Sequence, residues 1–188
     1  MVQCLKRNHA GSYSREDTMN NEVVYKKLLT DLKDRLGCTF CNDGIFAEMN
    51  LDLADYQEKT SPIHGVEFDF YHGNTEILRQ NVALVDDEWV QYFGEQTPVF
   101  CGFAEGKILS FCIVDENLFF TDEGIRIGSI GCVGTVPQYR NSGIGLRMVD
   151  LATLYLKEKG CNKSYVSYTH IDKWYAKLGY RTFARFSL

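Results

Sequence analysis

Apolar residues recur at helical spacing near the start of the chain and at strand spacing over much of the remainder. The first pattern predicts an amphipathic helix over residues 21–36, which ends at Gly37. Two short strands are expected within residues 38–49, paired through a turn at Asn42–Gly44. Further helices are expected over residues 74–84, 87–93, 143–159 and 171–178, and further strands over 66–70, 99–104, 107–114, 125–136, 165–168 and 180–186. This order of elements predicts a mixed α+β sheet domain.

The expected helix over residues 143–159 is amphipathic. Ile144 and Met148 lie on its apolar face, whereas Arg147 and Asp150 lie on the opposite, polar face.

Length and composition are those of one folded domain with a small extension. The chain has 188 residues, of which 45% are hydrophobic and 24% charged, which excludes a disordered or low-complexity protein. Residues 1–20 are polar and without periodicity, so we expect a flexible tail, then an N-terminal extension over 21–65 and the main domain over 66–188. No apolar run reaches the roughly 18 residues of a membrane span, and the first 20 residues lack the apolar segment of a secretory signal. We expect no membrane partner.

Charge is distributed unevenly along the chain. The formal net charge is −5, but residues 1–135 carry 11 basic and 22 acidic side chains, whereas residues 136–188 carry 9 basic and 3 acidic ones. The basic part is too short and too rich in apolar residues for a nucleic-acid-binding tail. It predicts a site for a small polyanion, with no nucleic-acid partner.

The seven cysteines are scattered and odd in number, so they cannot all pair. Reduced thiols in a cytoplasmic protein are the expectation. Cys38 and Cys41 form a lone C-x-x-C motif without a second pair of ligands, so we expect no metal site.

The segment between the expected strand 125–136 and the helix after it has the features of a phosphate-binding loop. Gly143 and Gly145 allow the backbone to approach a ligand closely, the start of a helix offers free N–H groups, and Arg140 adds positive charge. The loop lacks the third glycine of a dinucleotide-binding motif and the Gly-Lys-Ser/Thr of a P-loop. It predicts a site for a pyrophosphate.

The residues around this loop resemble a known family. Val136–Leu146, with Arg140, Gly143 and Gly145, resembles motif A of the GNAT superfamily of acyl-CoA-dependent N-acyltransferases, and Trp174–Tyr180 resembles its motif B. The resemblance covers roughly residues 66–188. It implies a mixed, mostly antiparallel central sheet flanked by helices, in which a splayed pair of strands holds acyl-CoA.

The resemblance also implies an activity and a set of site residues. The activity is transfer of an acetyl group from acetyl-CoA, the cosubstrate, to a primary amine by direct attack in a ternary complex. Tyr175 would protonate the leaving thiolate. The pantetheine arm would pair with backbone groups, and the pyrophosphate would bind the loop, so the residues implied in cosubstrate binding are Gly134, Val136, Arg140, Asn141, Ser142, Gly143, Ile144, Gly145 and Leu146. The acidic front of the chain favours a cationic amine as acceptor. The alternative is a regulatory or interaction module of the same fold that binds CoA without catalysis.

Several features depart from the family pattern. Many relatives have a glutamate on the strand that corresponds to residues 125–136, where this chain has none, so the general base stays open among Glu105, Asp115, Glu116, His170 and the cluster Asp86–Glu88. Tyr168 and Ile171 stand where relatives often have Asn and Ala. The usual last strand has no counterpart in the pattern, so we expect residues 38–49 or a second copy, in a homodimer, to cover that edge of the sheet.

Overall fold

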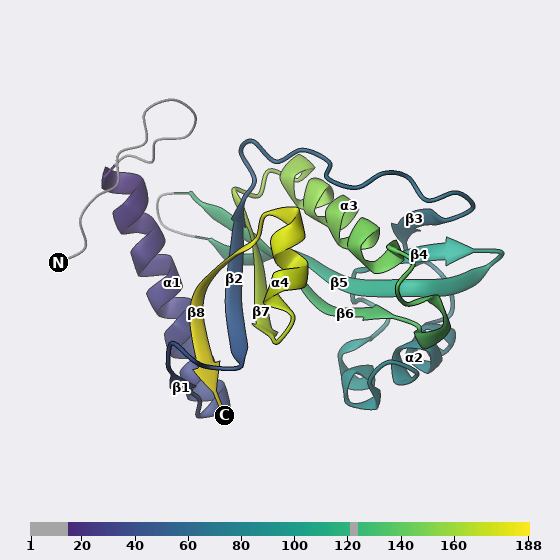
Figure 1. Ribbon diagram of the computed structural model, residues 1–188, viewed down its shortest axis with the longest axis horizontal. Coiled ribbons are helices and arrows are strands. Elements are labelled where there is room, and N and C mark those ends of the chain that lie inside the picture. The colour runs from purple at the N-terminus through teal and green to yellow at the C-terminus, as the bar shows by residue number, and fades with distance from the viewer. Residues whose placement is uncertain (1–14, 121–123) are drawn as a thin grey trace.

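The computed structural model describes residues 15–120 and 124–188, and side chains from Tyr25 onwards. Its centre is an eight-stranded sheet in the order β1-β8-β2-β7-β6-β5-β4-β3, with helices on both faces (Figure 1). The strands are β1 (Thr39–Phe40), β2 (Phe46–Asp52), β3 (Glu67–Phe70), β4 (Val99–Ala104), β5 (Lys107–Phe120), β6 (Arg126–Thr135), β7 (Lys163–Thr169) and β8 (Arg181–Ser187). The helices are α1 (Arg15–Leu36), α2 (Thr75–Ala83), α3 (Ile144–Glu158) and α4 (Asp172–Tyr175), with 3-10 helices η1 (Asp87–Tyr92), η2 (Pro137–Tyr139) and η3 (Ala176–Leu178).

The sheet confirms the expected mixed, mostly antiparallel architecture. Every strand pair among the described residues is antiparallel except β6 with β7, which is parallel. Most of the expected elements are present, with shifted ends: α1 begins at Arg15, and β5 continues to Phe120. Residues 1–14 of the expected tail lie outside the described residues.

The two expected strands near the N-terminus exist, but the prediction that they pair with each other was wrong. β8 lies between them: Phe186 is opposite Phe40 on one side and opposite Phe46 on the other. The reason is apolar packing, because the fully buried Phe186 ring contacts the rings of both residues. The N-terminal segment therefore flanks the final strand on both sides. This agrees with the expectation that residues 38–49 cover that edge of the sheet.

The helices pack on opposite faces of the sheet. Successive residues of a strand point to opposite faces. On β5, Cys112 belongs to the core under α3 and α4, whereas the neighbouring Phe111 belongs to the core under α2. On β7, Val166 lies in the α3 core and Tyr165 packs with Leu28 of α1. Thus α3 and α4 cover one face, and α1 and α2 cover parts of the other.

The polar face of α3, which carries Arg147 and Asp150, does not face solvent. Asp150 is fully buried and Arg147 is 8% exposed, because the connection from β2 to β3 crosses the outer side of α3 (Figure 1). The Asp150 carboxylate accepts hydrogen bonds from the Lys59 N–H (2.8 Å) and from the Thr60 N–H (2.7 Å) and hydroxyl (2.6 Å). Arg147 donates to the Thr60 carbonyl (2.7 Å) and pairs with Glu58. We call residues 56–63 the strap.

Candidate active site

Strands β6 and β7 pair over only three residues and then separate. Ile127, Gly128 and Ser129 lie opposite residues 163–165, whereas β6 runs on to Thr135 and β7 to Thr169. Figure 1 shows the two strands diverging from this point. The expected splayed pair is confirmed, and it leaves the second half of β6 with an edge that β7 does not cover.

A β-bulge lies in this uncovered half. Gly131 pairs with Ile113 and Gly134 pairs with Phe111, so two residues of β6 stand opposite Cys112. One of them, Cys132, has a left-handed backbone with φ of 46°. A Cβ atom added to Gly131 would meet no protein atom within 4 Å, so the face of β6 beside the bulge is open.

The phosphate loop has the geometry that its glycines indicated. Asn141 (φ 63°) and Gly143 (φ 83°) adopt left-handed conformations that turn the chain into α3. No side chain of the described residues caps α3, so the N–H groups of its first turn, at Ile144, Gly145 and Leu146, lack such a partner. Ser142 is exposed, and its hydroxyl donates to the Tyr139 carbonyl.

Arg140 is held at the end of the uncovered edge. Its side chain is exposed, and its Nε donates to the Thr135 carbonyl at 3.1 Å. The guanidinium therefore stands where β6 meets the phosphate loop.

Gly145 is required by packing. A Cβ atom at this position would lie 2.5 Å from the Thr135 hydroxyl oxygen and 3.7 Å from the Trp174 ring. The glycine thus lets the first turn of α3 rest directly on β6 and on motif B.

Gly134 and Val136 lie next to this edge, but their peptide groups point toward β5. The Val136 N–H donates to the Leu109 carbonyl (2.9 Å), and its carbonyl accepts from the Tyr139 N–H (2.9 Å). Gly134 is two residues earlier, on the same side of the strand, and a Cβ there would meet the Phe111 ring at 2.3 Å. The residue between them, Thr135, is the one whose peptide groups face the uncovered edge. Sequence reasoning missed Thr135, although strand alternation points to it once the pairing with β5 is known.

Tyr175 is buried in the core beneath α4, at 4% exposure. Its ring packs edge-to-face against Trp174 and Tyr180. Among the described residues, none forms a hydrogen bond with its hydroxyl. Burial raises its pKa well above the usual range, and the nearby thiols of Cys112 and Cys132 add to this effect, so the phenol stays protonated. Tyr175 is thus a neutral phenol whose proton is not engaged by any group in the described part of the chain.

The candidates for the general base lie in different parts of the structure and have different partners. Glu105 lies in the β4–β5 turn and Glu116 pairs with Arg126 at 3.3 Å. Asp115 accepts from the Asn117 N–H, and His170 is exposed after β7. Asp86 is half-buried at the start of η1, and its negative charge adds to the effect of burial in raising the pKa of the Cys132 thiol.

Sequence reasoning missed a buried carboxyl group, Glu48 of β2. Glu48 is fully buried, and it accepts hydrogen bonds from the Tyr165 hydroxyl, the Ser167 hydroxyl (3.1 Å) and the Tyr168 N–H (2.8 Å). Tyr168 has a left-handed backbone with φ of 55° at the free end of β7. A single acidic residue between apolar ones in an expected strand was the signal, but its partners are more than 100 residues away.

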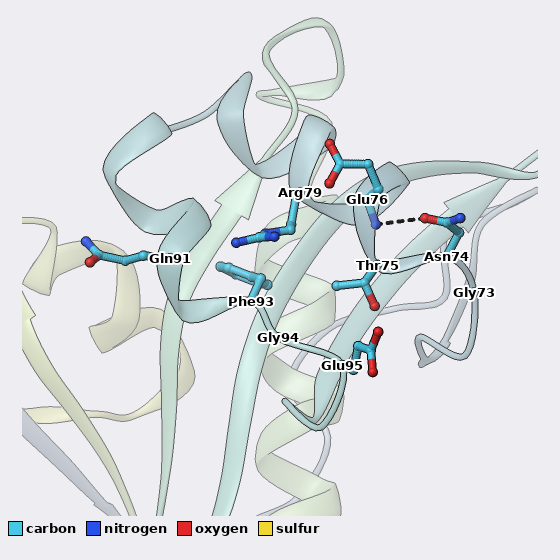
Figure 2. Close-up of a pocket in the computed structure, with 9 residues that line it drawn as sticks. All are labelled: Gly73, Asn74, Thr75, Glu76, Arg79, Gln91, Phe93, Gly94 and Glu95. Atoms are coloured by element: carbon cyan, nitrogen blue, oxygen red, sulfur yellow. Dashed lines mark hydrogen bonds between the residues drawn. The ribbon is translucent and has the colours of Figure 1, made fainter.

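A separate cavity of about 690 Å³ lies between the start of α2 and the end of η1 (Figure 2). Its charged lining residues are Glu76, Arg79 and Glu95, and Asn74 caps α2 by accepting from the Glu76 N–H. Neither the phosphate loop nor Asp86 lines this cavity. It is therefore distinct from the place where β6 and β7 separate.

Within residues 15–120 and 124–188, no three His, Cys, Asp or Glu side chains gather in a way that could hold a metal ion. The six cysteines of this part of the chain are free thiols, and Cys38 is buried. None of the helices described is long and apolar enough to cross a membrane.

Comparison with known proteins gives the class. Residues 56–180 match the acetyltransferase (GNAT) family. The chain is 28% identical over 138 residues to a glucosamine 6-phosphate N-acetyltransferase of Trypanosoma brucei brucei, covering 72% of this chain and 83% of that protein. The chain belongs to the GNAT family, a class of acetyl-CoA-dependent N-acetyltransferases.

Solved structures share the fold. One is a GCN5-related glucosamine N-acetyltransferase region of a fungal multidomain GH3 β-N-acetylglucosaminidase, with a TM-score of 0.68 and 19% identity, which covers 86% of this chain and 22% of that one. Another is a GCN5-related N-acetyltransferase from Sphaerobacter thermophilus, with a TM-score of 0.61 and 14% identity, which covers 85% of this chain and 54% of that one. The chain thus spans less than two thirds of either structure.

Proposed function

We propose that the protein transfers the acetyl group of acetyl-CoA to a primary amine by direct attack within a ternary complex. The observation that carries the proposal is the separation of β6 from β7 just before the phosphate loop. It leaves a free strand edge that leads to a helix N-terminus without a capping side chain.

The residues present fit acetyl-CoA. A pantetheine arm contains amide groups, which suit the Thr135 N–H on the uncovered edge, because the Thr135 carbonyl already accepts from Arg140. A pyrophosphate suits the N–H groups of the first turn of α3 and the guanidinium of Arg140. The amides of Asn141, Ser142 and Gly143 complete the loop, and Gly134 and Val136 contribute by fixing the edge rather than through the Val136 N–H, which β5 occupies.

Acetyl-CoA supplies a thioester whose carbonyl carbon a free amine attacks. The chain's contribution is to hold it and to manage protons. Tyr175 is the group proposed to protonate the leaving sulfur, because its phenol is protonated and has no protein hydrogen-bond partner among the described residues. It also belongs to the core that contains Ile130 and Val133 of β6. Burial in the α4 core keeps this donor fixed relative to β6.

The curated relative is named for its action on glucosamine 6-phosphate. An amino-sugar phosphate is therefore the first acceptor that we propose for this chain. Its ammonium group suits the acidic front of the sequence, whereas its phosphate requires positive charge elsewhere in the site.

The test is an assay of free thiol released from acetyl-CoA with a panel of amines: glucosamine 6-phosphate, glucosamine, spermidine and a peptide with a free N-terminus. We expect acceptor-dependent thiol release, highest with glucosamine 6-phosphate. Binding of acetyl-CoA, seen as a thermal shift that scales with its concentration, without thiol release for any amine would favour the CoA-binding module instead. The absence of a carboxylate on β6 is the observation that favours that second function.

A further inference from the structure

We propose that Asp86 is the general base that takes a proton from the acceptor amine. This inference rests on the proposed function and adds the residue that the resemblance leaves open. It assigns Asp86 to the face of the sheet opposite Tyr175.

The turn that carries Asp86 packs on the sheet at the bulge. Its neighbours Val85 and Trp89 belong to the same apolar cluster as Cys132, under α2 and η1. Tyr175 belongs to the core on the other face, under α3 and α4. Asp86 and Tyr175 therefore approach β6 from its two faces.

The pKa values of Cys132 and Tyr175 are consistent with this placement of Asp86 and Tyr175. Burial raises its pKa to about 11, and the negative charge of Asp86 contributes to this shift. The same thiol contributes to the raised pKa of Tyr175. These contributions agree with the packing, which places the two groups at opposite faces of the same strand.

There is room for an amine beside the bulge. Among the described residues other than its chain neighbours, no atom lies within 4 Å of the position that a Cβ on Gly131 would take. One oxygen of the Asp86 carboxylate accepts from the Glu88 N–H at 3.0 Å, which fixes the side chain as the cap of η1. In the described part of the protein the carboxylate has no ion-pair partner, so its second oxygen is available to an ammonium group.

Other carboxylates are less suited. Glu116 and Glu58 are paired with arginines, and Glu48 is enclosed by three donors. Asp87 and Glu88 follow Asp86 on η1 but are exposed. The charged residues of α2 are Glu76, in its first turn, and Arg79, whose Nε donates to the Val90 carbonyl. On the sheet, the titratable group that Asp86 influences is Cys132.

Protons and bonds balance in the proposed step. Asp86 takes one N–H proton from the ammonium and passes it to solvent. The freed lone pair of nitrogen forms the C–N bond to the thioester carbonyl, the C–S bond breaks, and Tyr175 gives its proton to the sulfur. The second N–H proton, released as the amide forms, restores the phenol. The products are the amide, the free thiol of CoA and one proton in solvent.

The test compares Asp86→Asn with Asp87→Asn in the full chain. Asparagine is also a good N-cap, so Asp86→Asn removes the charge and keeps η1. We expect kcat/KM for the amine at pH 7 to fall about 100-fold, while the Kd for acetyl-CoA stays within about twofold of wild type. The loss should shrink as pH rises toward the pKa of the amine, because the free amine then needs no base. Asp87→Asn should behave as wild type.

A variant Asp86→Ser, which also caps a helix, repeats the test with a shorter side chain. Wild-type turnover in Asp86→Asn, or a loss that does not shrink at high pH, overturns the assignment. So does a loss of acetyl-CoA affinity in both variants that matches the loss of turnover. If the wild-type protein releases no thiol with any amine of the panel, the proposed function fails. That outcome is distinct from an active wild type whose Asp86→Asn variant has the same turnover.

Discussion

The hydroxyl of Tyr56 donates a 2.8 Å hydrogen bond to the buried carboxylate of Asp150, 94 residues later in the chain. This contact joins the strap to α3, the helix whose first turn forms the phosphate loop. At the far end of the strap, the Ile63 side chain lies within 3.9 Å of where a Cβ on Gly143 would be. The strap thus runs from the middle of α3 to the loop itself.

Asp150→Ala should destabilise the protein strongly. The change removes the acceptor for Tyr56, Lys59 and Thr60 and leaves the buried Arg147 with a weaker negative environment. Breaking a buried ionic network of this kind costs about 3–5 kcal/mol. The free energy of unfolding in urea measures it. Tyr56→Phe, which removes one hydrogen bond and leaves the others, should cost about 1–2 kcal/mol; an equal or larger cost would show that the carboxylate does not anchor the strap.

This network marks the boundary of what the sequence can predict. Local periodicity predicts helix α3 and the strand before it, and motifs A and B place the phosphate loop and Tyr175. Whether Arg147 and Asp150 face solvent or a covering segment depends on residues about 90 positions away, which no local pattern encodes.

The pairing of β8 shows the same limit. The alternation around Phe46 predicts a strand, and the turn residues Asn42–Gly44 suggest a hairpin with the strand before it. The competing partner, Phe186, is 140 residues away and prevails because it buries its ring between Phe40 and Phe46. Likewise, which peptide groups of β6 are free became clear only from its register with β5.

The burial of Glu48 predicts a specific pH dependence of stability. Burial raises the pKa of its carboxyl group above the ordinary value of 4.5, although hydrogen bonds from Tyr165, Tyr168 and Ser167 act in the opposite direction. A folded-state pKa above the unfolded one means that the stabilisation is fully present below the unfolded pKa. It is lost as pH rises through the folded pKa.

Urea denaturation of the wild type and of Glu48→Gln, from about pH 4 to about pH 8, measures this effect. We expect the free energy of unfolding of the wild type, minus that of the variant, to fall as pH rises. Glu67→Gln, at an exposed position on β3, is the control and should show a constant difference. A constant difference for Glu48→Gln would mean that the buried carboxyl group titrates normally.

Gly145→Ala should weaken acetyl-CoA binding through a defined clash. The new Cβ would lie 2.5 Å from the Thr135 hydroxyl oxygen, so the first turn of α3 must move away from β6. We expect the Kd for acetyl-CoA to rise about tenfold, equivalent to about 1.4 kcal/mol. Isothermal titration calorimetry measures the change.

The double variant Thr135→Ala/Gly145→Ala tests the cause. It removes the hydroxyl oxygen and leaves the Thr135 Cβ at an ordinary 3.9 Å, so the Kd should return toward that of Thr135→Ala alone. Additive effects of the two changes would exclude the clash as the cause.

Tyr175→Phe tests the proposed acid without disturbing the fold, because within the described chain no protein group bonds to the hydroxyl that the change removes. We expect kcat to fall about 100-fold and the KM for acetyl-CoA to change less than about threefold. Steady-state thiol release gives both constants. Tyr180→Phe is the matched control for stability, since it loses hydrogen bonds with Thr153 and Ser164 and should lower the free energy of unfolding, whereas Tyr175→Phe should not. Unchanged turnover in Tyr175→Phe would remove this residue from the mechanism.

Gly131 offers a test of where the acceptor lies. Its φ is outside the left-handed region, and a Cβ there would meet no atom of the described residues beyond its chain neighbours, so an alanine fits without rearranging the fold. The methyl groups of a valine would extend further into the same space. If the amine occupies that space beside Cys132 and Asp86, Gly131→Ala should raise the KM for the amine slightly and Gly131→Val about tenfold, equivalent to about 1.4 kcal/mol. The Kd for acetyl-CoA should stay close to that of the wild type in both. A rise in this Kd in step with the KM for the amine would place the added methyl groups against the cosubstrate instead, and an unchanged KM for the amine would put the acceptor elsewhere on the sheet.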